Sequence, residues 1–307
     1  MTTRRFVLAA LVTTTFAAPL FPANAQTPLP ADKRAELNAL IAKNNAYIGL
    51  LNRTMRAKQS WERYTSWVNV EKGPTGRERY ITYGLYSLYD VRSEIQKALD
   101  AAGKAPKVDE LDRAIERFVG AYETLAPLID RAERYYERKD YKSDNMAEGR
   151  ELHARLVPAA REFLKEDVNT RQLMKLFAGR VAELELAAIE MEEGRKARWQ
   201  MKRVQIAARQ AMDLLPNREN PIVDMPAFSS AVAEYGKVVR EFDDFMRANP
   251  DSGATMRDRP GSLLGKLREY EEELQRARGD ARRARGQGTT WIVNEYNMMI
   301  SMSQMFR

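Results

Sequence analysis

Residues 169–215 read NTRQLMKLFAGRVAELELAAIEMEEGRKARWQMKRVQIAARQAMDLL, and this stretch decides the fold class. Its apolar side chains recur at helical spacing for more than forty residues. It contains no proline, the residue that most strongly disrupts a helix interior. At 1.5 Å per residue, one uninterrupted helix over this range would be about 65 to 70 Å long. We therefore expect a single continuous rod here.

The remainder of the chain also has the periodicity of amphipathic helices. They are predicted over residues 32–67, 77–102, 109–139, 145–165, 227–248, 262–285 and 289–305. The segment Gly73-Pro74-Thr75-Gly76 predicts a tight connection, and Pro127 predicts a kink in the third helix. No window alternates apolar and polar residues over the length of a strand, and no heptad pattern is sustained.

The sequence thus predicts an all-α fold, in the form of an elongated antiparallel bundle of long helices. Residues 26–307 are expected to form a single all-helical domain. Three prolines and two asparagines in residues 216–226 predict a linker inside this domain.

The first 25 residues have the pattern of an export signal. Arg4 and Arg5 precede the mostly apolar stretch Phe6–Leu20, and Ala23-Asn24-Ala25 forms an A-x-A cleavage site. Threonines and a proline interrupt the apolar stretch, which falls short of the ~20 apolar residues that a membrane-spanning helix needs. We expect a signal peptide cleaved after Ala25, giving a periplasmic or secreted protein that does not span the membrane. An uncleaved N-terminal anchor is the alternative.

Composition narrows the classes of partner and cofactor. The chain has 50 basic and 43 acidic residues, with a formal charge of +7 that falls to +5 without residues 1–25. Dense charge of both signs is typical of solvated helix faces, whereas nucleic-acid binders concentrate basic residues on one face. Together with export, this pattern argues against nucleic acid as a partner. An envelope protein, an anionic lipid or a glycan fits better.

The absence of cysteine and the presence of a single histidine limit the chemistry of possible sites. Disulfides, thiolate ligands and the paired Glu-x-x-His motifs of di-iron bundles are excluded within one chain. We expect no cofactor, no metal site and no catalytic residue.

Three segments resemble the YiiG-like family. They are Trp67-Val68 followed by Lys72–Glu78 (KGPTGRE), then Tyr135–Asn145 (YYERKDYKSDN), and Tyr296–Ile300 (YNMMI). This family comprises exported bacterial proteins, many of them lipoproteins, with a domain of unknown function. The resemblance implies an all-helical envelope protein and no enzymatic role. Unlike the lipoprotein members, this chain has no cysteine at its cleavage site.

Aromatic residues cluster around the Gly-Pro turn. Tyr80, Tyr83, Tyr86 and Tyr89 recur every three residues, close in sequence to Trp67. Steps of about 300° on a helix would spread these tyrosines around its circumference, so some hydroxyls should reach the surface. Aromatic rings suit sugars, peptides or lipid headgroups, but packing of the rings inside the bundle, with the hydroxyls in water, is the more usual role and is favoured here. We take Trp67, Tyr80, Tyr83 and Tyr86 as a candidate binding surface.

A candidate polar cluster comprises Asp140, Asp144, Asn145 and His153. Four carboxylates, those of Asp140, Asp144, Glu148 and Glu151, have the spacing of calcium-loop ligands. Lys142 nevertheless occupies a ligand position, and Asn145 replaces the glycine that the loop requires. We therefore predict helix capping by Asp144 or Asn145. His153 is expected to pack at the edge of the core with one nitrogen hydrogen-bonded.

Two basic clusters, at residues 195–203 and 276–285, either contact anionic lipid or polysaccharide or form solvated charged faces. The sequence as a whole favours an exported, soluble helical protein of non-enzymatic binding or scaffold type. One alternative is a glycan-active envelope enzyme with paired carboxylates. The other is a small-ligand receptor with a closed aromatic pocket near Tyr83 and Trp67.

Overall fold

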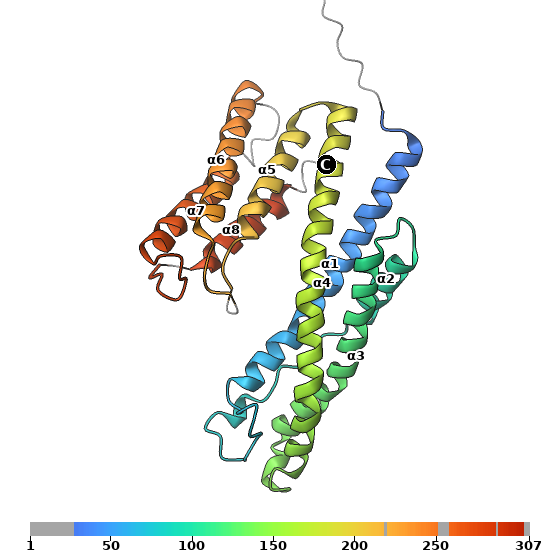
Figure 1. Cartoon of the computed structure of the whole chain (residues 1–307), viewed down its shortest axis with the longest axis vertical. Coiled ribbons are helices and arrows are strands. Elements are labelled where there is room, and N and C mark those ends of the chain that lie inside the picture. Colours follow the sequence, from blue (N-terminus) through green and yellow to red (C-terminus); the bar gives the residue numbers. More distant parts are fainter. Residues whose placement is uncertain (1–27, 218–219, 251–257, 287, 304–307) are drawn as a thin grey trace, which may run out of the picture.

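The computed structural model describes residues 28–217, 220–250, 258–286 and 288–303, so the predicted signal peptide lies outside the described residues. The elements in chain order are α1 (Ala31–Thr65), η1 (Ile81–Tyr83), α2 (Arg92–Gly103), α3 (Asp109–Arg138), η2 (Asp140–Lys142), α4 (Ala147–Glu193), α5 (Ala197–Met212), α6 (Met225–Ala248), α7 (Arg259–Arg276) and α8 (Thr289–Ser303) (Figure 1). Within those ranges the only β-type pairing is an isolated bridge between Ile222 and Asp280. The all-α prediction is confirmed.

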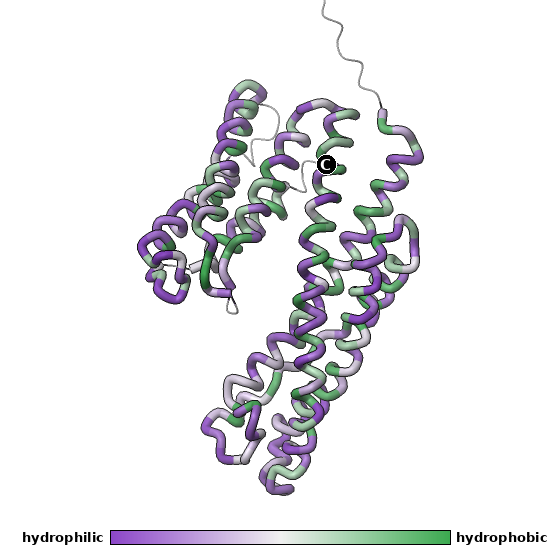
Figure 2. The backbone as a smooth tube through the Cα atoms, in the orientation of Figure 1, coloured by the Kyte–Doolittle hydropathy of each residue, from purple (hydrophilic) through white to green (hydrophobic). Residues whose placement is uncertain are grey.

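Two apolar cores hold the helices together. The long helices α1, α3 and α4 run alongside one another with α2 against them, and the shorter α5 to α8 form a second group beside α4 (Figure 1). The first core contains Tyr47 and Phe118, and the second contains Phe228 and Phe242, all fully buried. Hydrophilic and hydrophobic patches recur along the helices, as expected for helices that bury one face (Figure 2). The division of residues 26–307 into domains stays a prediction.

The prediction of one continuous rod over residues 169–215 is wrong, because the observed helix begins before residue 169 and ends before residue 215. Helix α4 starts at Ala147, so it passes through residues 165–169, where two separate helices were expected to meet. It then ends at Glu193. The next residue, the C-cap Gly194, has a φ of 75°, which glycine adopts without a steric cost. Glycine, rather than proline, interrupts the predicted stretch. The 47 residues of α4 span about 70 Å.

The predicted helix over residues 77–102 is also wrong, because helix α2 covers only Arg92–Gly103. Residues 84–91 are not helical and lie along α1. Ser60 of α1 accepts a hydrogen bond from the Tyr86 amide and donates one to the Tyr86 carbonyl, both at 3.1 Å. Side chains of α1 thus satisfy backbone groups that a helix would have paired internally.

Helix α7 ends at Arg276, earlier than the predicted residue 285. The chain turns at Arg278 and Gly279, whose φ angles are 54° and 80°. An added Cβ on Gly279 would lie 2.9 Å from the Val223 carbonyl oxygen, so only glycine fits this position. The turn places residues 279–281 against the connection between α5 and α6.

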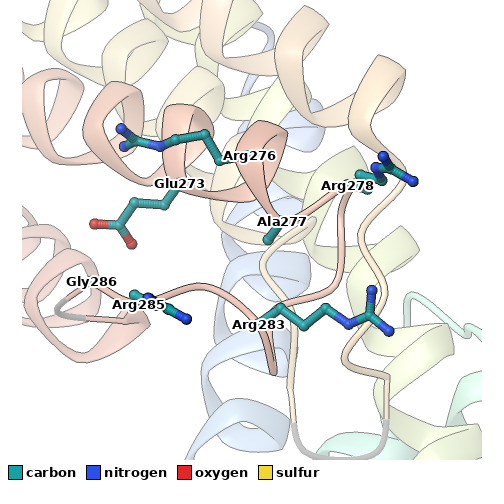
Figure 3. Close-up of a pocket in the computed structure, with 7 residues that line it drawn as sticks. All are labelled: Glu273, Arg276, Ala277, Arg278, Arg283, Arg285 and Gly286. Atoms are coloured by element: carbon teal, nitrogen blue, oxygen red, sulfur yellow. The ribbon is translucent and has the colours of Figure 1, made fainter.

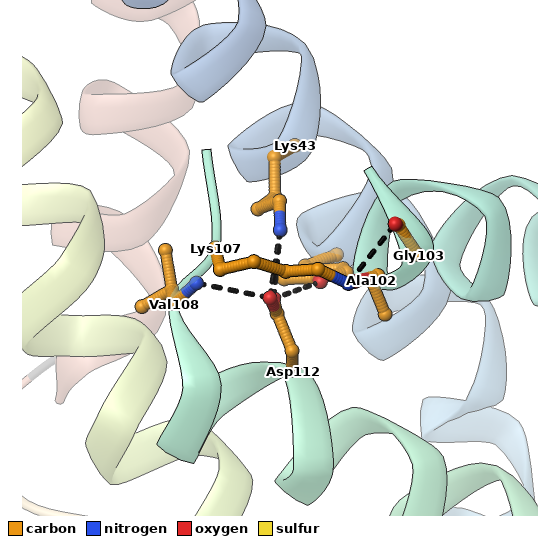
Figure 4. A network of polar contacts seen from close by, with 7 residues as sticks. Lys43, Ala102, Gly103, Lys107, Val108 and Asp112 are labelled. Carbon is orange, nitrogen blue, oxygen red and sulfur yellow. Dashed lines mark hydrogen bonds and ion pairs between the residues drawn. The ribbon is translucent and has the colours of Figure 1, made fainter. Parts of the chain in front are cut away.

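A buried ion pair joins α1 to α3 (Figure 4). Lys43 Nζ donates to both carboxylate oxygens of Asp112, at 2.9 and 2.8 Å, and both side chains are buried. The Tyr47 hydroxyl and the Val108 amide donate to the same carboxylate, at 2.5 and 2.9 Å. The charge is therefore surrounded by donors, which is the arrangement a buried carboxylate requires.

None of the helices in the described ranges is long and apolar enough to cross a membrane.

Candidate functional site

Trp67 lies in the core, apart from the surface on which the sequence placed it. Only 8% of its side chain is exposed, and its ring packs edge-on against Tyr64 and Tyr136, with centroids 5.2 and 5.0 Å away. Its indole Nε1 donates to the Gly84 carbonyl at 2.9 Å. Trp67 therefore stabilises the tyrosine-bearing segment from the core side, through its hydrogen bond to Gly84.

His153 is hydrogen-bonded through both ring nitrogens, one more than the sequence predicted. Its Nε2 lies 3.0 Å from the Val70 carbonyl, and its Nδ1 lies 2.9 Å from the Tyr64 hydroxyl. A carbonyl only accepts, so Nε2 carries the hydrogen and Nδ1 accepts from Tyr64. Burial raises the pKa of Tyr64 well above its usual range, which keeps the hydroxyl a donor. His153 thus fixes the loop after α1 onto α4.

The predicted polar cluster does not converge on one point. Asp144 accepts hydrogen bonds from the Tyr135 hydroxyl and from the amides of Met146 and Glu148, each at 2.9 Å, and so caps α4 as predicted. The Asp140 carboxylate pairs with Arg138 Nε at 3.7 Å, and the Asn145 backbone carbonyl accepts a hydrogen bond from Arg150. In the part of the chain that the structure describes, no group of three or more acidic or histidine side chains could hold a metal ion.

Removing the Asp144 cap should lower stability in a pH-dependent way. Burial alone would raise the pKa of this carboxyl, but the amide and tyrosine hydrogen bonds outweigh it and lower the pKa. We expect Asp144→Ala to cost about 1 kcal/mol at pH 7. Because the folded-state pKa is depressed, this contribution is fully present above the unfolded pKa of ~3.9 and is lost as the pH falls through the folded value.

Urea unfolding of the wild-type and Asp144→Ala proteins between pH 7 and pH 3 measures the effect. The difference in unfolding free energy should narrow below about pH 4. Asp140→Ala is the matched control, because Asp140 accepts no amide hydrogen bonds from the start of α4. A difference between wild type and Asp144→Ala that is constant over this pH range would contradict the explanation.

The tyrosines form an exposed row beside α1. Tyr80, Tyr83 and Tyr89 are 42, 48 and 49% exposed, and Tyr86 is half-buried. The rings of Tyr80 and Tyr83 stack with centroids 5.1 Å apart and planes inclined by 23°. Tyr83 belongs to η1, and Tyr86 and Tyr89 lie in the irregular residues 84–91. The prediction that these tyrosines lie on a helix is therefore wrong.

Arginines of α1, which were not among the predicted site residues, lie over these rings. Arg56 and Arg63 place their guanidinium carbons 3.9 and 4.2 Å from the centre of the Tyr86 ring, and Arg53 lies 4.5 Å from that of Tyr89. These are cation–π distances. Residues 53, 56, 60 and 63 fall at helical spacing, so this signal was present in the sequence.

Two of these arginines are also held in place by backbone carbonyls of residues 83–87. Arg63 Nε donates to the Tyr83 carbonyl at 2.5 Å, and Arg56 Nε lies 3.4 Å from the Ser87 carbonyl. Each guanidinium group is therefore oriented by a carbonyl and a ring. Arg56 Nη1 also donates to Gln59 Oε1 at 3.2 Å, and a guanidinium group has five N–H donors in all, so each group keeps donors that can reach a ligand.

An open hollow of about 700 Å³ lies beside this row. Its lining consists of Arg56, Gln59, Glu62, Arg63, Ser66, Tyr83 and Tyr86. The surface thus combines aromatic faces, guanidinium donors, an amide and a hydroxyl. Among the described residues that line it, Glu62 is the only carboxylate.

The chain is similar to known proteins over most of its length. The family described as "Protein of unknown function (DUF3829)" matches residues 38–302. The Escherichia coli (strain K12) protein named "Uncharacterized protein YiiG" is 27% identical over 213 residues. That alignment covers 64% of this chain and 58% of the relative, so the chain spans less than two thirds of the relative's length. No solved structure matches the chain.

Proposed function

We propose that this chain, which belongs to the DUF3829 family, is an exported, non-enzymatic binding protein of the bacterial envelope that takes an acidic glycan on its tyrosine and arginine surface. The observation that carries the proposal is the stacked, exposed pair Tyr80 and Tyr83 beside a hollow lined by Arg56 and Arg63. Aromatic faces stack on sugar rings, and guanidinium groups pair with carboxylates. The pattern of residues 1–25 supports export to the periplasm or beyond.

The small number of carboxylates around the hollow favours glycan binding over glycan hydrolysis as the function. Glycosidases generally use two carboxyl groups that flank the scissile bond. The described lining has only Glu62, and the rest is suited to hydrogen bonding and stacking. A small-ligand receptor is less well supported, because Trp67 is in the core and the hollow beside Tyr83 is open.

Removing the stacked rings should weaken glycan binding without unfolding the protein. We expect Tyr80→Ala with Tyr83→Ala to reduce affinity for purified peptidoglycan, an envelope glycan with many carboxylates, by roughly tenfold or more. The exposed rings contribute little to the core, so the free energy of unfolding should change by no more than about 1 kcal/mol for the pair. Co-sedimentation with peptidoglycan and urea unfolding of the same samples provide both measurements.

Tyr89→Ala is the matched control, because Tyr89 is as exposed as Tyr83 but does not line the hollow. It should bind as the wild type does. Equal losses in Tyr89→Ala and in the double variant would contradict the proposed surface, as would unchanged binding by the double variant.

A further inference from the structure

A second charged surface lies at the C-terminal end of α7, where an open hollow of about 520 Å³ is lined by four arginines (Figure 3). They are Arg276, Arg278, Arg283 and Arg285, and Glu273 is the one acid that the described lining contains. Figure 3 shows the side chains of Arg278 and Arg283 on one side of the hollow and those of Arg276 and Glu273 on the other. The local excess of positive charge attracts anions.

The loop that follows α7 is held at residues 279–281 by the connection between α5 and α6. The Val223 amide donates to the Gly279 carbonyl, and the Ala281 amide donates to the Pro221 carbonyl, both at 2.9 Å. These bonds flank the bridge between Ile222 and Asp280. Arg278 and Arg283, which flank these residues, therefore project from a fixed part of the backbone, which lowers the conformational entropy lost on binding.

Most of these charges are not neutralised inside the protein. Asp280 pairs with Arg282 and Arg283, at 2.8 and 3.4 Å. Across the ranges that the structure describes, Arg276, Arg278 and Arg285 have no carboxylate within ion-pair distance. Three guanidinium groups at one hollow thus remain available to an external anion.

Two large apolar side chains near the loop after α7 are exposed to solvent. Trp291 is 55% exposed and lines an adjoining hollow that shares Glu273, Arg276 and Gly286 with the first. Ile222, the bridge partner of Asp280, is 60% exposed. The adjoining hollow also contains acids: Glu269 is paired with Lys266 at 2.8 Å, and Glu272 and Glu273 line it as well.

We propose that this surface, defined by Arg276, Arg278, Arg285, Trp291 and Ile222, docks the protein on an anionic lipid membrane. The arginines bind lipid phosphate groups, and the two apolar side chains enter the headgroup region. Basic residues next to exposed tryptophan and aliphatic side chains are typical of proteins that lie at a membrane interface. A polyanion in solution would match the arginines but offers nothing apolar for Trp291 and Ile222. This inference does not depend on the proposed glycan surface.

Vesicle co-sedimentation of the predicted mature chain, residues 26–307, tests the charge component. We expect binding to vesicles with 30% phosphatidylglycerol and weak binding to pure phosphatidylcholine. Replacing Arg276, Arg278 and Arg285 by glutamine should weaken binding on the order of 100-fold, since each basic group near an anionic membrane contributes roughly fivefold. Unchanged binding by the triple variant would overturn the proposal.

The control removes the same net charge elsewhere. Arg92, Arg138 and Arg161 are exposed and each is paired with a carboxylate, so replacing all three by glutamine leaves the proposed surface intact. The control variant should lose far less affinity than the first. An equal loss would show that overall charge alone drives binding, and would overturn the proposal.

Tryptophan fluorescence tests the apolar component. Trp61, Trp67 and Trp199 are at most 8% exposed, so Trp291 is the tryptophan whose surroundings a membrane can change directly. Anionic vesicles should shift the emission to shorter wavelength, and Trp291→Phe should abolish the shift. An unshifted wild-type spectrum on saturated vesicles would overturn the proposal. So would inorganic polyphosphate binding as tight as vesicle binding, because it would identify a polyanion in solution as the partner.

Discussion

Replacing Asp112 by alanine is expected to destabilise the protein by roughly 3 to 5 kcal/mol, because it leaves the buried ammonium of Lys43 without its counter-charge. The side chains of Lys43 and Asp112 are only 2 and 7% exposed, so the pair is shielded from bulk water. The hydroxyl of Tyr47 and the amide of Val108 would lose their acceptor at the same time. Urea unfolding at pH 7 measures the change.

A double variant separates the effect of an unpaired charge from the effect of lost packing. Lys43→Met with Asp112→Leu removes both charges and keeps apolar volume, so it should recover much of the stability lost in Asp112→Ala. Recovery will be incomplete because the Tyr47 hydroxyl and the Val108 amide still lack an acceptor. Glu162→Ala, which breaks the exposed pair with Lys165, is the control and should have a far smaller effect. A double variant less stable than Asp112→Ala would contradict this account.

The helices were predictable from sequence because they follow from local periodicity. The observed α1 and α3 begin and end within two residues of the predicted ranges. The failures came from residues whose conformation depends on distant partners. Residues 84–91 look helical in isolation, but Ser60 and Arg56 of α1 form hydrogen bonds with their backbone groups. The break at Gly194 was not predicted because residues 169–215 contain no proline, although glycine also ends helices.

The candidate site was predictable only in part, for a related reason. The spacing of the tyrosines indicated that some reach the surface, and the structure exposes Tyr80 and Tyr83. The arginines of α1 come from more than 20 residues away in sequence, and only the fold brings them onto the rings. The ion pair between Lys43 and Asp112 joins residues 69 apart, so no local pattern marks it as buried. Long-range side-chain pairs of this kind require the tertiary structure.

Trp67→Ala should also cost roughly 3 to 5 kcal/mol of unfolding free energy, because it removes a large buried ring from between Tyr64 and Tyr136. The change would also leave the buried Gly84 carbonyl without its indole donor. Trp67→Phe keeps most of the apolar volume and loses that hydrogen bond, so we expect a smaller cost of about 1 to 3 kcal/mol. Thermal and urea unfolding of both variants test this order.

The same variants distinguish support of the tyrosine surface from participation in it. Trp67 contacts the segment from the core and does not line the hollow, so folded Trp67→Phe should bind peptidoglycan as the wild type does. Tyr83→Ala should show the opposite pattern, with weaker binding and nearly unchanged stability, because its ring is half exposed. Weaker binding by folded Trp67→Phe with an unchanged melting temperature would place Trp67 in the binding surface and contradict its assignment to the core.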